Sequence, residues 1–170
     1  MKYMEIALVS KSSLRIKGKS ASFLVDPQSD AAVNAFLLLN PDEEFISEQA
    51  VTVSGAGEYE IGGVKITGLR NEKSVLYSIH LDGLDIAVGT ITLFFAMQHK
   101  LKEHNVIAVR CDEMIDASFL TSLSINAVLF YGEKAAEVTQ GFEKEKLITI
   151  NKYAATLGKL SAEMETVLLA

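Results

Sequence analysis

The chain has very little cysteine and proline, and each shortage excludes a class of protein. The single Cys111 cannot form an internal disulfide and excludes sites built from several cysteines, such as zinc ribbons and iron–sulfur clusters. One free thiol is typical of a reducing compartment. Two prolines, a hydrophobic fraction of 49% and a charged fraction of 22% exclude a disordered or collagen-like chain. The sequence predicts a globular protein with one domain over residues 1–170.

Basic charge is also in short supply. Sixteen Lys and Arg residues stand against 22 Asp and Glu residues, for a net charge of −6. Proteins that bind nucleic acid grip the phosphate backbone with clustered Lys and Arg, whereas the basic residues of this chain are scattered. We therefore expect no nucleic-acid partner.

Long apolar runs are missing as well. The longest uncharged stretch, residues 117–132, is interrupted by Ser, Thr and Asn and is shorter than the roughly 18 residues that span a membrane. The first residues include Lys2 and Glu5 and lack the long apolar block of a signal peptide. We expect no membrane contact and a cytoplasmic location.

Alternation of apolar and polar residues is the main structural signal. Residues 4–8 and 14–16 alternate apolar with polar side chains, and a turn at 17–19 leads into residues 21–25, so a hairpin is predicted whose second strand ends at Asp26 and Pro27. Further strands are predicted over 36–39, 51–53, 59–61, 64–66, 75–81, 84–88, 106–109, 127–131, 146–150 and 165–169. Gly62 with Gly63 is predicted to form a tight hairpin turn.

Few segments show a helical pattern. We expect a helical turn over 31–34, the end of a short helix over 99–105, and a helix over 117–123 that Asp116 caps. The chain therefore reads as one α/β unit with many hairpins and few crossovers.

A glycine-rich segment carries a resemblance to a known family. Residues 53–68 read VSGAGEYEIGGVKITG, and residues 77–87 read YSIHLDGLDIA. The first segment resembles the Gly-x-Gly-Glu-Tyr-Glu-x-Gly-Gly-x-x-Ile hairpin of the metallo-β-lactamase superfamily, in its ascorbate-6-phosphate-lactonase-like branch of zinc-dependent hydrolases. The first hairpin, which closes with Val25, Asp26 and Pro27, also resembles this branch, as do residues 114–117 at the opening of a late helix. The resemblance implies an α/β (α+β) fold, a short four-layer αββα sandwich of two mixed sheets.

The same resemblance implies a metal motif that this chain does not carry. The family places a His-x-His-x-Asp-His run after a buried strand, where imidazoles and a carboxylate hold one or two zinc ions. The matching positions here are Asn40, Asp42, Glu44 and Phe45, and only the carboxylate of Glu44 is similar in type.

The remaining ligand positions differ too. Thr90 stands where the bridging aspartate is expected, the middle histidine would fall near Asn71, and the last histidine would fall near Gly132. Zinc needs about three protein ligands to activate water. The resemblance therefore implies a domain that has lost its zinc site, and we expect no cofactor and no catalytic residue.

The other candidate groups give weak signals. His80 is predicted to face solvent, and His99 and His104 lie at a spacing that does not put two ligands on one helix face. Cys111 is read as a small buried residue rather than a nucleophile. The acids around Asp42 could hold Mg²⁺ or Ca²⁺, although a solvated acidic loop is the simpler interpretation.

One apolar run is placed where active relatives carry a polar loop. Residues 91–97 read ITLFFAM, and exposed apolar groups of this size would each forfeit about 1.5–3 kcal/mol. Leu93, Phe94, Phe95 and Met97 either fill the core or form a contact surface for a second copy or for an unidentified protein partner.

Three functions remain open at this point. We expect a non-catalytic binding or assembly module; the alternatives are a metal-dependent hydrolase with a carboxylate site around Asp42 and Glu44, and a small-ligand binder. The last would keep polar groups near Gly57, Thr90 and Gly132. Fold alone does not choose among them.

Overall fold

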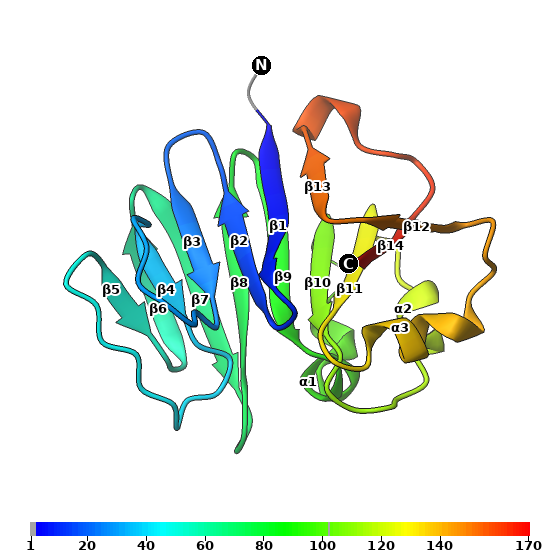
Figure 1. Ribbon diagram of the computed structural model, residues 1–170. Helices are drawn as coiled ribbons and strands as arrows, with labels where there is room; N and C mark the ends of the chain where they lie inside the picture. The colour runs from blue at the N-terminus through cyan, green and yellow to red at the C-terminus, as the bar shows by residue number, and fades with distance from the viewer. Residues whose placement is uncertain (1–2, 102) are drawn as a thin grey trace.

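The computed structural model describes residues 3–101 and 103–170 and shows two mixed β-sheets packed face to face (Figure 1). The six-stranded sheet A contains β1 (Met4–Ser10), β2 (Ser13–Lys17), β3 (Ser22–Val25), β4 (Ala35–Leu37), β5 (Val51–Val53) and β13 (Lys152–Ala155). Its strand order is β13-β1-β2-β3-β4-β5. This confirms the predicted fold class of two mixed sheets in an α/β chain.

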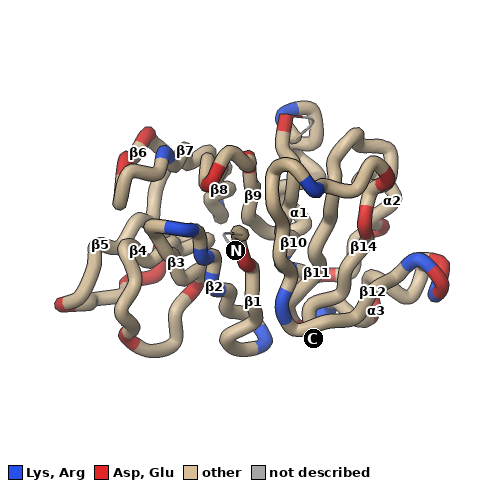
Figure 2. Tube along the Cα trace, turned by 90° about the horizontal axis from the view of Figure 1, so that it is seen from above, with Lys and Arg blue, Asp and Glu red and all other residues tan. Residues whose placement is uncertain are grey.

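Sheet B has eight strands. They are β6 (Gly57–Ile61), β7 (Val64–Arg70), β8 (Val75–Leu81), β9 (Leu84–Thr90), β10 (Val106–Arg110), β11 (Ala127–Tyr131), β12 (Leu147–Ile150) and β14 (Glu165–Leu169). The order is β12-β14-β11-β10-β9-β8-β7-β6, so β12 and β6 are the two edge strands. Seen from above, β1–β5 form one row and β6–β9 a second row opposite (Figure 2).

The helices are short and all follow strands of sheet B. They are α1 (Ile91–Ala96), α2 (Ser118–Thr121) and α3 (Ala135–Val138), with 3₁₀ turns at Gln98–Lys100, Thr139–Gly141 and Leu157–Lys159. Figure 1 shows α1 at the lower end of β9 and β10, and α2 and α3 beside β11. Within the described ranges, no helix is both long enough and apolar enough to cross a membrane.

The outer side of sheet A is covered by loop instead of helix. The ring of Phe45, in the loop between β4 and β5, lies 4.7 Å from the ring of the fully buried Phe36. Thr52 on β5 fixes this loop by donating its hydroxyl to the Phe45 carbonyl, at 2.8 Å. A loop thus takes the place of a helix in the layer outside sheet A.

The alternation read from the sequence builds the core between the sheets. Side chains at alternate positions point to opposite faces of a strand, so Ile6, Leu14, Phe23 and Leu37 on sheet A face Ile79 and its neighbours on sheet B. All five of these side chains are fully buried. A second cluster, which includes Leu93 and Phe94, packs between sheet B and its helices.

The predicted glycine hairpin is confirmed. Gly62 and Gly63 connect β6 to β7 and have φ angles of 61° and 78°, a region that L side chains rarely adopt. The next hairpin turns at Asp82 and Gly83, which also have positive φ.

Several local predictions are wrong. Residues 31–34 form bends and no helical turn, and the helical part of 99–105 is a 3₁₀ turn that ends at Lys100. The helix predicted over 117–123 is the single turn α2, although Asp116 does accept a hydrogen bond from the Ser118 amide at 2.9 Å. Residues 91–97, expected as a loop, include α1. Strand β13 was missed, because its residues show little alternation of apolar and polar character.

Candidate functional site

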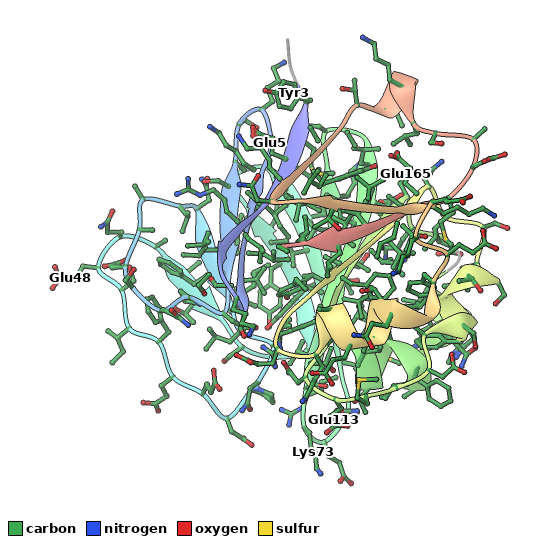
Figure 3. All side chains as sticks on the ribbon, turned by 45° about the vertical axis from the view of Figure 1, so that its right-hand side comes forward. Tyr3, Glu5, Glu48, Lys73, Glu113 and Glu165 are labelled. Atoms are coloured by element: carbon green, nitrogen blue, oxygen red, sulfur yellow. The ribbon has the colours of Figure 1, made fainter. Side chains whose placement is uncertain are left out.

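The carboxyl ends of parallel strands from both sheets meet at one edge, which we call the strand-end edge. It is formed by Asp26 after β3, Asn40 after β4, Thr90 at the end of β9, Arg110 at the end of β10 and Gly132 after β11. In α/β folds, ligands bind at the carboxyl ends of strands. Figure 3 labels Lys73 and Glu113, from two loops of this edge, both at the lower end of the molecule.

An ion pair joins the two sheets at this edge. Nη1 of Arg110 donates to Oδ2 of Asp26, and Nε of Arg110 donates to Asp112 at 2.8 Å. The other oxygen of Asp26 accepts from the Leu39 amide at 2.9 Å. Only 10% of the Asp26 side chain and 17% of the Arg110 side chain are exposed, so the pair lies largely outside solvent. It fastens β3 and the chain after β4 to β10.

The charges in this pair are set by burial and by each other. Burial raises the pKa of Asp26 to about 6, against the opposing effects of the Arg110 guanidinium and the Leu39 amide. For Arg110, burial acts to lower the pKa, but Asp26, Tyr131 and Asp112 together outweigh it and the pKa lies above its usual range. The raised pKa of Asp26 favours a neutral carboxyl, whereas the raised pKa of Arg110 favours a charged guanidinium. The direct contact between the guanidinium and the carboxylate favours the ionic form of the pair. At neutral pH both partners are charged.

Two further groups beside the pair are buried and uncharged. Burial raises the pKa of the Cys111 thiol to about 12, so the thiol stays protonated, and Cys111 is fully buried as the sequence predicted. Tyr131 is also fully buried, and burial raises its pKa well above the usual range. Its hydroxyl has no hydrogen-bond partner among the described residues.

The residues at the expected metal positions hold loops in place. Oδ1 of Asn40 accepts from the Asp42 amide at 2.9 Å, and Oδ1 of Asn71 accepts from the Ser74 amide at 2.9 Å. Thr90 caps α1 by accepting from the Leu93 amide at 3.3 Å. These side chains are engaged by their own backbone, as in Asx turns and helix caps.

The other expected positions also lack the geometry of ligands. Phe45 packs its ring on Phe36, and Asp42 and Glu44 lie exposed in the loop that follows β4. Gly132 has a φ angle of 103°, and a Cβ there would lie 3.1 Å from backbone atoms of Cys111. A histidine at Gly132 would therefore need the backbone to shift.

The residues at the expected metal positions can be tested against the donor set that zinc needs. Within residues 3–101 and 103–170, no three His, Cys, Asp or Glu side chains come together in a way that could hold a metal ion. The donors nearest the expected site are an ion-paired carboxylate and amide oxygens already engaged in turns. The zinc ion that the fold implies does not fit this donor set.

The histidines lie elsewhere. His80 is exposed, as predicted, and its Nδ1 is hydrogen-bonded to Asp85 at 2.8 Å. His104 lies against β8: its Nδ1 donates to the Leu101 carbonyl at 3.2 Å, so Nε2 accepts from the Ser78 hydroxyl at 2.8 Å. The Ser78–His104 contact ties the segment after the 3₁₀ turn to sheet B.

The predicted interface residues divide between the core and the surface. Leu93 and Phe94 are fully buried, so these two fill the core, which is one of the two predicted alternatives. They therefore have no free surface for a partner. Phe95 is 52% exposed and stacks edge-on against Phe119 of α2 at 5.2 Å. Met97 is half-buried. The helical period of α1 separates these residues, because it turns only one face toward the sheet.

Sequence reasoning missed a large groove on the outer side of sheet B. A groove of about 1180 Å³ lies between α2, α3, β12 and the start of β14. Its residues come from three separate segments, 114–121, 137–148 and 161–166. No motif marks it, because no one of these segments shows the concavity by itself.

Known proteins resemble this chain in structure. A protein described as a zinc-dependent hydrolase of the metallo-β-lactamase superfamily, from Thermotoga maritima, matches with a TM-score of 0.70 and 12% identity over 97% of each chain. The metallo-β-lactamase fold protein YhfI from Bacillus subtilis matches with a TM-score of 0.56 and 8% identity, over 98% of this chain and 96% of YhfI. The metallo hydrolase Igni18 from Ignicoccus hospitalis matches with a TM-score of 0.55 and 9% identity, over 81% and 89%.

Sequence comparison finds no counterpart. No protein-family model matches the chain, and no curated protein matches it. Structural matches at these identities carry information about the fold and not about the activity. The two face-to-face mixed sheets, the strand-end edge and the three solved relatives agree that this chain has the metallo-β-lactamase fold.

Proposed function

We propose that this chain is a degenerate member of the metallo-β-lactamase superfamily that binds or assembles with other molecules and does no zinc chemistry. The observation that carries the proposal is the use of the expected metal positions. Asn40, Asn71 and Thr90 cap turns or a helix, Phe45 fills the outer layer, and a side chain at Gly132 would crowd the backbone of Cys111.

The ion pair supports the same proposal. An active site of this family concentrates positive charge in its metal ions, whereas here the guanidinium of Arg110 supplies a fixed positive charge beside Asp26. Arg110 cannot release or activate a water molecule as a metal ion does. The strand-end edge is thus built for stability between the sheets.

A closer relationship to the lactonase-like branch is part of the proposal. It is supported by the hairpin of β6 and β7, whose glycines lie in the turn and whose Tyr59 hydroxyl donates to the Gly55 carbonyl at 3.0 Å. We place the protein in a reducing, cytoplasmic compartment on the strength of its single buried thiol.

Metal analysis tests the proposal. Protein purified without chelator should contain no stoichiometric zinc, iron, manganese or magnesium, and its melting temperature should not respond to EDTA. A ligand at a hundred times its dissociation constant adds about 2.7 kcal/mol to the stability of the folded state, so a true site would give a clear shift. Stoichiometric metal together with a chelator-induced drop in melting temperature would contradict the proposal.

The alternative of a carboxylate metal site has one feature in its favour. Asp42, Glu43 and Glu44 are three consecutive acids in the loop that follows β4. Adding Mn²⁺ or Mg²⁺ distinguishes the two functions. The hydrolase would be favoured if the ion raises the melting temperature, if Asp42→Asn and Glu44→Gln remove this rise, and if the protein hydrolyses a phosphoester or a lactone.

A further inference from the structure

The groove occupies a gap in the helical layer outside sheet B. Helices α2 and α3 have four residues each, and the groove of about 1180 Å³ runs between them onto β14 and the edge strand β12. Sheets of this architecture bury their outer face against helices. The concave space beside β12 and β14 is therefore shaped for a helical element that the described chain does not supply.

The floor of the groove is apolar. Ile115, Phe142 and Met164 line it while packing against the buried cluster between sheet B and the helices. Met114, which also lines the groove, is 59% exposed. Met is enriched at surfaces that bind partner helices, because its flexible thioether adapts to different shapes.

The walls of the groove are acidic. Five of the lining side chains are carboxylates and one is a lysine: Asp116, Glu137, Glu143, Glu163, Glu165 and Lys146. Glu143 is partly neutralised by Lys146 at 3.4 Å, and Glu137 by Lys134 at 3.4 Å. Asp116 and Glu163 belong to no ion pair formed within residues 3–101 and 103–170. Glu165 instead accepts from the Tyr153 hydroxyl at 3.4 Å, on the face of β14 that it shares with the buried Val167. Figure 2 shows acidic positions beside α2 and β14.

We propose that this groove binds an amphipathic helix of a partner protein, with an apolar stripe of Leu, Met or Phe flanked by Lys and Arg. The apolar floor takes the stripe, and the carboxylates of Asp116 and Glu163 meet the basic flanks. The inference rests on the proposed binding function and names its surface and its class of partner.

The charge of the groove argues against two other occupants. A symmetric contact with a second copy would set one acidic groove against another, and like charges brought together across an interface are costly. A nucleic acid would bring phosphates to the same carboxylates.

The test uses the full chain and a model helix. The probe is a peptide of Leu and Lys, about 18 residues and ~27 Å long as a helix, with one apolar stripe. Amide shifts in the NMR spectrum should move in the three lining segments, and binding should weaken as salt is raised. A peptide of the same design with Glu in place of Lys should not bind.

Matched variants locate the binding. The double variant Asp116→Lys with Glu163→Lys should bind the Leu–Lys peptide about tenfold or more weakly than the parent protein. The double variant Glu58→Lys with Glu60→Lys should bind the peptide as tightly as the parent protein does. Glu58 and Glu60 are exposed on β6, the opposite edge strand of sheet B, so they report non-specific attraction to an acidic protein. Met114→Ser should weaken the binding through lost apolar contact.

Three results of the peptide experiments would overturn the inference. They are no amide shift at millimolar peptide, shifts outside the groove, or equal loss of affinity in the groove variants and the β6 variants. Light scattering that shows a dimer broken by the groove variants would assign the groove to a second copy, against the inference. Metal analysis is independent of these results: bound zinc would remove the proposed function, while absent peptide binding in a metal-free protein would remove the groove inference alone.

Discussion

Replacing Arg110 with methionine tests whether the ion pair holds the strand-end edge together. Methionine keeps much of the length of the arginine stem and removes its charge and its donors. Asp26, whose side chain is 10% exposed, would then keep only the hydrogen bond from the Leu39 amide. Removing one partner of a buried pair strands the other charge, which destabilises a fold by about 3–5 kcal/mol.

The loss should depend on pH in one direction. Burial already raises the pKa of Asp26 from 3.8 to about 6, which at 1.36 kcal/mol per pH unit is about 3 kcal/mol against the ionised form. Without Arg110 the pKa of Asp26 rises further. The folded variant then keeps a proton that the unfolded chain has lost, so the destabilisation is small near pH 4 and grows as pH rises through the folded pKa.

Urea unfolding followed by circular dichroism at about pH 5 and about pH 8 measures this effect. The double variant Asp26→Asn with Arg110→Met should be more stable at the higher pH than Arg110→Met alone, because no buried charge is left unpaired. Lys11→Met is the control: its pair with Glu133 lies at 3.3 Å with both side chains more than half exposed, and should contribute less than about 1 kcal/mol. An Arg110→Met protein as stable as the parent at pH 8, or equally destabilised at both pH values, would refute the reasoning.

Two further pairs of substitutions give contrasting outcomes. Gly63→Val should lower the free energy of unfolding by about 1–3 kcal/mol through its positive φ alone. Gly62→Val should cost more in urea unfolding, because its Cβ would also lie 2.9 Å from the side-chain nitrogen of Asn34. Equal losses would contradict the packing at Gly62. Phe94→Ser should destabilise by about 3–5 kcal/mol, and Phe95→Ser by about 1 kcal/mol through the lost contact with Phe119. If light scattering shows a dimer, Phe95→Ser should yield a folded monomer; an unchanged dimer would exclude Phe95 from that interface.

The strands were predictable because they are amphipathic. In β1 and β2 every second side chain lies between the sheets, so the period of two is visible in the sequence. The hairpin turn at Gly62 and Gly63 was predictable because its geometry requires glycine. Strand β13 and the loop over sheet A were not, since their places depend on contacts with distant segments, such as Phe45 on Phe36, that no local pattern encodes.

The candidate site was predictable only as a set of replacements. The residues at the positions of the family's ligands could be read along the chain, but their use as caps and packing groups depends on the fold. Arg110 and Asp26 are 84 residues apart, and nothing in either local sequence pairs them. The groove likewise joins three segments whose separate patterns show only a short helix, a loop and a strand.

The strand-end edge and the groove differ in what they leave free for a ligand. At the strand-end edge the buried carboxylate is neutralised by Arg110 and the backbone takes up the polar side chains, so little remains there to attract a ligand. At the groove, carboxylates flank an apolar floor, and the side chain of Met114 remains 59% exposed. Exposed apolar area beside charges of one sign favours a partner that covers the apolar area and neutralises the charges. If the chain has lost the chemistry of its fold, the side of sheet B between α2 and α3 is where a binding function would be retained.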